Sequence, residues 1–182
     1  MSPSRLERGR TVFLDRDGTI NESPPEGEYL TSPDAVRLIP GAAEAIRTLN
    51  EHPAKVVVVT NQRGIALGKM TEADLAAVHE RLVSELAGAG ARLDGIFHCP
   101  HHVEACDCRK PGTDMFERAA REIDGVGIEG GAMIGDSAID IEAGRRLGIT
   151  TVRLGESPAS DPTPSHGAEN LLAAVRWLTS SL

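Results

Sequence analysis

Residues 12–21 read VFLDRDGTIN, and this stretch predicts both the architecture of the chain and the place of its site. Three apolar residues lead into Asp15 and Asp17, and a glycine–threonine turn follows. A short apolar run closed by a polar turn is typical of a buried strand that ends at a site. Because open α/β sheets bind ligands at the carboxyl ends of their strands, we expect both aspartates at such an edge. Carboxylates this close repel each other unless a cation lies between them or one keeps its proton, and such hard oxygen ligands suit Mg²⁺.

Apolar runs bounded by turns recur along the chain and alternate with helical patterns. The runs cover Val12–Leu14, Lys55–Thr60, Gly95–Cys99, Ala132–Ile134 and Thr150–Leu154. The helical patterns cover Gly41–Glu51, Thr71–Gly88, Thr113–Ile123, Ala138–Leu147 and Ala168–Leu178. This alternation predicts an α/β fold with a Rossmann-like parallel sheet flanked by helices.

Two connections are longer than usual. Glu22–Pro40 and Pro100–Pro111 are predicted to lie at the same edge of the sheet as Asp15, where long loops are usually functional. Neither is long enough to form a separate lid domain, so we expect a capless site that is open to substrate. The segment Glu156–Gly167 is rich in Ser, Pro, Asp and Thr and is predicted to be a surface loop, not a domain boundary.

Length and composition indicate a soluble globular protein. The 182 residues suit one compact domain, residues 1–182, and with only 3% aromatic residues its core must be built from Val, Ile, Leu and Ala. The net charge of −8 argues against a nucleic-acid partner or an anionic membrane surface. It does not exclude a small anionic substrate, because a metal ion and a few cationic side chains can reverse the local field.

The sequence predicts neither a membrane span nor a secretory signal. No apolar run approaches the ~20 residues of a membrane span, and Met1–Arg10 is polar. All 3 cysteines lie within residues 99–108, whereas a secreted disulfide framework would spread an even number along the chain. We therefore expect a cytoplasmic protein without a membrane partner, and a monomer.

Polar groups also follow two other predicted strands. Thr60 and Asn61 end the second run, where a hydroxyl beside the glycine-bearing backbone of QRG is suited to hold phosphate oxygens; the alternative is a simple polar turn. Asp136 follows the fourth run in the sequence MIGDSAID, and Asp140 lies one helical turn later on the same face. The alternative there is a helix N-cap, for which Asp136 or Ser137 would serve.

The sequence Arg109-Lys110-Pro111-Gly112 precedes the helix predicted to begin near Thr113. A helix N-terminus favours anions, and two cations beside it would reinforce that preference. An Arg–Lys pair that is merely solvated on the surface is the alternative.

Taken in chain order, these four segments resemble the four motifs of the haloacid dehalogenase (HAD) superfamily of phosphohydrolases, with Asp15 and Asp17 in the first and Asp136 in the fourth. The resemblance covers residues 12–153. It implies that Asp15 is the nucleophile and that Asp17 is the general acid and base. Thr60 and Lys110 would bind the phosphate, and Mg²⁺ would be held by Asp15, the Asp17 carbonyl and Asp136. A domain that only stores phosphate on an aspartate is a rival of another class, but Asp17 could activate the water that clears the adduct.

The segment 99–108 reads CPHHVEACDC and has the C-x-H…C-x-C arrangement of a closed tetrahedral zinc site. The predicted zinc ligands are Cys99, His101, Cys106 and Cys108. His102 is the other candidate for the imidazole ligand, and a strained Cys106–Cys108 disulfide is the alternative to zinc. The loop ends at Arg109, so zinc would hold the substrate-facing cations in place.

With a zinc loop and no cap domain, the chain resembles the HAD subgroup that hydrolyses heptose 1,7-bisphosphate or histidinol phosphate. The resemblance implies a small phosphorylated metabolite as substrate, with Asn61, Arg63 and Arg109 gripping the part beyond the reacting phosphate. Two arginines near the mouth favour a sugar bisphosphate, namely D-glycero-D-manno-heptose 1,7-bisphosphate. The short spacer between His101 and Cys106 is nearer the histidinol type, so that substrate stays open.

Overall fold

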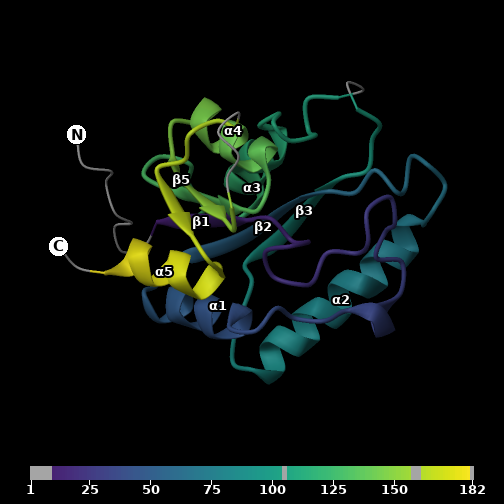
Figure 1. Cartoon of the computed structure of the whole chain (residues 1–182), viewed down its shortest axis with the longest axis horizontal. Coiled ribbons are helices and arrows are strands. Elements are labelled where there is room, and N and C mark those ends of the chain that lie inside the picture. The colour runs from purple at the N-terminus through teal and green to yellow at the C-terminus, as the bar shows by residue number, and fades with distance from the viewer. Residues whose placement is uncertain (1–9, 104–105, 157–160, 181–182) are drawn as a thin grey trace.

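The computed structural model describes residues 10–103, 106–156 and 161–180, and it contains a parallel sheet between two layers of helices (Figure 1). The strands are β1 Thr11–Leu14, β2 Lys55–Asn61, β3 Gly95–Cys99, β4 Ala132–Gly135, β5 Thr150–Leu154 and β6 His166–Ala168. The helices are α1 Ala42–Glu51, α2 Glu72–Gly88, α3 Asp114–Glu122, α4 Ala138–Arg146 and α5 Leu171–Thr179, with a 3₁₀ turn, η1, at Pro33–Ala35. The predicted fold class is confirmed.

The strand order is β3-β2-β1-β4-β5-β6, and every neighbouring pair is parallel. The first strand is therefore central, with β2 on one side and β4 on the other. Since the carboxyl ends of these three strands meet at one edge, the polar residues that follow them are brought together.

The strands are apolar on both faces because helices cover both. Val12 and Leu14 pack with α1, α2 and α5, whereas Phe13 packs with α3 and α4. Phe13 and Phe116 meet edge to face, with ring centroids 4.9 Å apart. A parallel sheet buried on both sides is typically made of continuous Val, Ile and Leu runs, which explains the low aromatic content of this core.

The structure differs from the sequence prediction at the C-terminal end. His166 and Gly167, expected in a surface loop, belong to β6, which pairs with β5. Helix α5 begins at Leu171 and not at Ala168, because the Asn170 side chain caps it by accepting a hydrogen bond from the amide of Ala173. The helix boundary therefore follows the capping residue.

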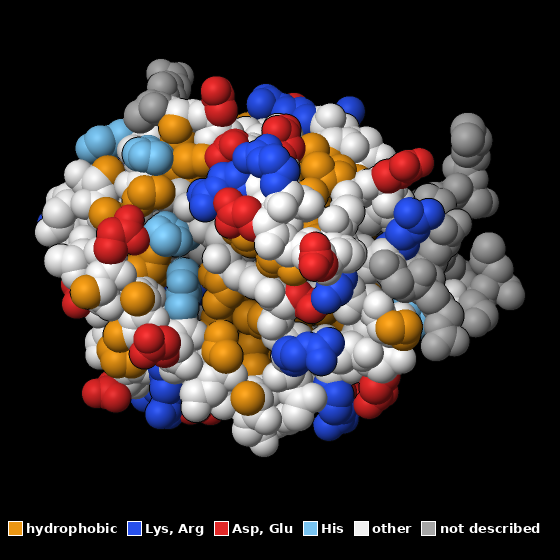
Figure 2. All heavy atoms as spheres, turned by 180° about the vertical axis from the view of Figure 1, so that it is seen from behind, with side chains coloured by type: hydrophobic (Ala, Val, Ile, Leu, Met, Phe, Trp, Pro, Cys, Tyr) orange, Lys and Arg blue, Asp and Glu red, His pale blue; other side chains and the backbone are white. Residues whose placement is uncertain are grey.

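The surface carries few large hydrophobic side chains. Those most exposed in the described part of the chain are Leu67, Val83, Val103 and Ile139. Figure 2 shows the face opposite to that of Figure 1, with hydrophobic side chains near its centre and histidines along one side. Within the described residues, no helix combines the length and apolar character needed to cross a membrane.

Two valines on α2 test this packing, because Val78 is fully buried and Val83 is 44% exposed. Val78→Ala should lower the free energy of unfolding by about 2 kcal/mol through lost burial and a cavity. Val83→Ala, the matched control, should change it by less than about 0.5 kcal/mol. Urea denaturation measures both, and equal effects would contradict the placement of α2.

Candidate active site

The site is built at the carboxyl edge of three neighbouring strands. Asp15 follows β1, Thr60 lies at the end of β2 and Asp136 follows β4. Lys110 comes from the connection between β3 and α3, and Asp140 lies in the first turn of α4. Residues from four separate segments of the sequence therefore reach one edge of the sheet.

Lys110 joins two of the carboxylates. Its ammonium donates to Asp15 Oδ1 at 2.9 Å and to Asp140 Oδ1 at 2.7 Å, and the residue is only 2% exposed. The other oxygen of Asp140 accepts hydrogen bonds from the amide and the hydroxyl of Ser137. Burial alone would lower the pKa of Lys110, but the two carboxylates raise it above the ordinary value, so the side chain stays cationic.

The carboxylates of Asp15, Asp136 and Asp140 form an acidic cluster whose oxygens lie within 4.8 Å of one another. Burial raises the pKa of Asp15 to about 7, although Lys110 opposes the shift. Burial and the neighbouring Asp140 also raise the pKa of Asp136. One ammonium does not balance three carboxylates, so the cluster has the charge and the hard oxygen donors that a divalent cation such as Mg²⁺ requires.

Gly18 is required beside this cluster. Its φ is +77°, and a Cβ there would overlap the carboxylate of Asp136. The turn of the first motif thus lies directly against the fourth motif.

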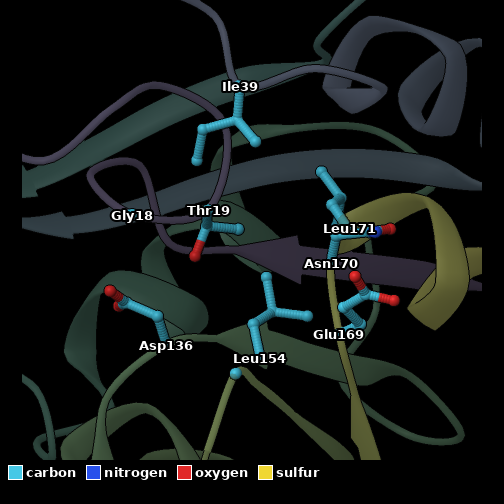
Figure 3. Close-up of a pocket in the computed structure, with 9 residues that line it drawn as sticks. Gly18, Thr19, Ile39, Asp136, Leu154, Glu169, Asn170 and Leu171 are labelled. Atoms are coloured by element: carbon cyan, nitrogen blue, oxygen red, sulfur yellow. The ribbon is translucent and has the colours of Figure 1, made fainter.

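A cavity of about 350 Å³ opens next to Asp136 (Figure 3). Gly18 and Thr19 line it on the side of β1, and Leu154, Glu169 and Leu171 line it on the side of β5 and α5. The Thr19 hydroxyl is buried and has no hydrogen-bond partner among the residues that the structure describes. The acidic cluster therefore borders open space and is not sealed inside the core.

Asp17 points to a different set of partners. The buried Arg16 donates from Nε to Oδ1 at 3.0 Å and from Nη2 to both carboxylate oxygens, at 2.9 and 2.8 Å. Asn21 donates to Oδ1 at 2.9 Å and Gln62 to Oδ2 at 3.1 Å. The two aspartates of the first motif thus pair with different cations, Asp15 with Lys110 and Asp17 with Arg16.

Gln62 links Asp17 to Thr60, because its Nε2 also donates to Thr60 Oγ1 at 2.9 Å. The hydroxyl accepts this bond and keeps its own hydrogen for an anionic oxygen. The sequence analysis missed Arg16, Asn21 and Gln62. Arg16 could have been predicted, because an arginine between two aspartates at the end of a buried strand needs an anionic partner.

Asn61 is engaged with the main chain of Lys110. Its Nδ2 donates to the Lys110 carbonyl at 3.1 Å, and its Oδ1 accepts from the Lys110 amide at 2.9 Å. This pair of bonds ties the end of β2 to the segment that carries the ammonium.

A second cavity, of about 450 Å³, lies beside Lys110. Arg109 and Arg146 line it together with the exposed apolar side chains of Val103 and Ile139, whereas Arg63 does not. Arg109 Nη1 and Arg63 Nε are both buried without a hydrogen-bond partner in the described chain. The structure thus brings Arg109 to the site and keeps Arg63 apart from this cavity.

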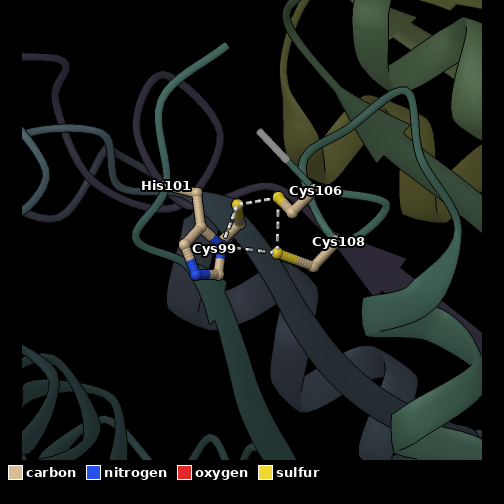
Figure 4. Close-up of side chains that lie close together, drawn as sticks. All are labelled: Cys99, His101, Cys106 and Cys108. Atoms are coloured by element: carbon tan, nitrogen blue, oxygen red, sulfur yellow. Dashed lines mark hydrogen bonds between the residues drawn. The ribbon is translucent and has the colours of Figure 1, made fainter. Parts of the chain in front are cut away.

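The four predicted zinc ligands also come together (Figure 4). The sulfurs of Cys99 and Cys106 are 3.4 Å apart, those of Cys106 and Cys108 are 3.0 Å apart, and His101 Nδ1 lies 3.2 Å from the Cys108 sulfur. All three cysteines are free, and His102 is not part of the cluster. Burial raises the pKa of the Cys99 and Cys108 thiols, so a cation would have to replace their protons. Three sulfurs and one imidazole fit a closed zinc site.

Residues 5–148 match the model of the haloacid dehalogenase-like hydrolase family, and the chain belongs to that family. A D-glycero-beta-D-manno-heptose-1,7-bisphosphate 7-phosphatase from Rhodopseudomonas palustris is 40% identical over 154 residues, which cover 80% of this chain and 83% of that protein. The protein of the same name from Escherichia coli O6:H1 is 38% identical over 182 residues, covering 94% of this chain and 89% of that protein.

The solved structure of the D,D-heptose 1,7-bisphosphate phosphatase from B. bronchiseptica, complexed with magnesium and phosphate, is similar to this fold. The TM-score is 0.82 and the identity 31%, with 93% of this chain and 97% of that chain covered. Together with the family match, these relatives make the chain a phosphatase, that is, a hydrolase of phosphoric monoesters, and not a domain that only stores phosphate.

Replacing Lys110 tests the electrostatics of the site. Lys110→Met should lower the free energy of unfolding at pH 7 by about 3–5 kcal/mol, because it leaves buried carboxylates without their cation. Lys69→Met, at an exposed lysine, is the control and should change it by less than about 0.5 kcal/mol. A loss in the Lys110 variant no larger than that of the control, measured by urea denaturation, would show that the ion pairs do not stabilise the fold.

Proposed function

We propose that the chain removes the 7-phosphate of D-glycero-D-manno-heptose 1,7-bisphosphate through an aspartyl-phosphate on Asp15. The observation that carries the proposal is the contact of Asp15 with Lys110, at the edge where Thr60 and Asp136 also lie. The names of the relatives and their coverage of the chain support this substrate.

In the first step the Asp15 carboxylate attacks phosphorus, and the bond between phosphorus and the O7 oxygen of the sugar breaks. Asp17 gives its proton to the departing oxygen. In the second step Asp17 takes a proton from water, whose oxygen attacks phosphorus, so that phosphate leaves and Asp15 is restored. The Lys110 ammonium and the Thr60 hydroxyl bind the phosphoryl oxygens, where negative charge must be stabilised.

Asp15, the main-chain carbonyl of Asp17 and Asp136 would hold Mg²⁺. When bound, it offsets the charge of the phosphoryl group and of the acidic cluster. The proximity of the three carboxylates and the raised pKa values of Asp15 and Asp136 support this assignment.

The second phosphate of the substrate is assigned to Arg109. Arg63 does not line the cavity beside Lys110 and the Asn61 amide is bonded to the Lys110 main chain, so neither is assigned to this phosphate. The unpartnered Arg109 Nη1 and the cavity beside Lys110 support a second anionic group close to the reacting one. A guanidinium binds phosphate through two parallel hydrogen bonds, so it would recognise this group well.

Steady-state kinetics with Mg²⁺ tests the substrate. We expect kcat/KM for the heptose 1,7-bisphosphate to exceed that for histidinol phosphate by on the order of 10²-fold or more, because the latter leaves Arg109 unpaired. Asp15→Asn should abolish turnover while the unfolding midpoint is retained. A preference for histidinol phosphate would overturn the substrate, whereas an active Asp15→Asn variant would overturn the nucleophile.

We also propose zinc in the cluster of Cys99, His101, Cys106 and Cys108. Two adjacent histidines give a matched pair of variants. His101→Ala should lower the zinc content of the purified protein and reduce kcat/KM about tenfold or more, because the loop positions Arg109 and Lys110. His102→Ala should retain both zinc and activity. Elemental analysis decides the point, and equal zinc in the two variants would exclude His101 as the ligand.

A further inference from the structure

Arg16 has a partner besides Asp17. Its guanidinium is fully buried, and while Nε and Nη2 bond Asp17, Nη1 lies 3.1 Å from Nε2 of His79 on α2. Arginine is always protonated and can only donate, so the imidazole must accept through Nε2. His79 is therefore neutral, with its proton on Nδ1.

The surroundings of His79 favour this neutral form. Its ring packs against that of His98, with centroids 6.0 Å apart, and His98 in turn pairs with Glu72 at 2.9 Å. Burial, reinforced by the charge of Arg16, lowers the pKa of His79 to about 3. These contacts form a chain that leads from partly exposed His98 through His79 and Arg16 to the carboxylate of Asp17.

The bond to His79 sets the rotation of the guanidinium. With Nη1 held by the imidazole, the edge formed by Nε and Nη2 faces the Asp17 carboxylate. Without the imidazole acceptor, a buried N–H would lose its partner, and the guanidinium would turn to recover one. The orientation of Asp17 would change with it.

We propose that His79 is a positioning residue for the phosphatase reaction, holding Arg16 so that its guanidinium orients the carboxylate of Asp17. The inference rests on the acid–base role of Asp17 given above. His79 contacts neither the nucleophile nor the second cavity in the described structure, so its effect should fall on turnover and not on substrate binding.

Three variants test the hydrogen bond. His79→Leu keeps the bulk but removes the acceptor, and should lower kcat about tenfold while KM changes less than about twofold. His79→Gln places an amide oxygen near the position of Nε2, and should restore kcat to within about threefold of the wild type. His98→Leu removes the neighbouring ring without touching Arg16, and should leave kcat nearly unchanged. Equal losses in the Leu and Gln variants would overturn the proposal.

A double-mutant cycle separates positioning from simple damage to the fold. In the Asp17→Asn background, His79→Leu should reduce the residual kcat by less than about twofold, because the carboxylate through which it acts is gone. A full tenfold loss in that background would mean that His79 acts elsewhere and would overturn the inference. A wild-type kcat in the Asp17→Asn variant would contradict the acid–base role of Asp17. An impaired Asp17→Asn variant together with a fully active His79→Leu variant would contradict only the role of His79.

The tautomer gives a readout that is independent of catalysis. In the wild-type protein labelled with ¹⁵N-histidine, His79 should show an unprotonated Nε2 and a protonated Nδ1 at pH 7. A proton on Nε2 would rule out the bond from Arg16.

Discussion

The Lys110 ammonium between Asp15 and Asp140 is the interaction on which the rest of the site depends. It joins the end of β1, the segment before α3 and the first turn of α4 in a place where water cannot replace any partner. Buried charges of this kind persist only when they are paired. The Asn61 side chain also forms two hydrogen bonds with the main chain of Lys110, and the cysteine loop ends just before Lys110. The Lys110 ammonium is therefore held in place only when all of these segments at the edge of the sheet are correctly arranged.

The two aspartates of the first motif are identical side chains in contrasting surroundings. Asp15 faces a cation that it shares with Asp140, close to Asp136, and burial favours its neutral form until the local charge is balanced. Asp17 faces Arg16 and two amides, which fix the orientation of its carboxylate. Pairs of titratable groups held in contrasting surroundings are a common basis for separate chemical roles. Only Arg16 separates them in the sequence, and it supplies the cation that pairs with Asp17, whereas Asp15 pairs with Lys110.

The fold, and the residues that the structure brings together in the candidate site, could be predicted from the sequence because they rest on local patterns. Buried strands read as apolar runs, and the polar residues after β1, β2 and β4 mark one edge. Strand β6 has only His166, Gly167 and Ala168, so its pairing with β5 leaves no apolar signal. The contact of Arg16 with His79 spans 63 positions and depends on side-chain rotamers, which no local pattern records. The same reason applies to Gln62, whose amide joins two site residues only after β1 and β2 have paired.

The central place of β1 also affects how the molecule forms. Asp15 and Lys110 are 95 positions apart, and the amide of Gly127 bonds the Thr11 hydroxyl across 116 positions. During synthesis on the ribosome, β1 and the valine-rich β2 emerge long before β4 can cover the open side of β1. Non-local parallel pairing of this kind slows folding and leaves apolar strand edges exposed to other chains. The strand order that gathers the candidate site residues is therefore also one that closes the sheet late in folding.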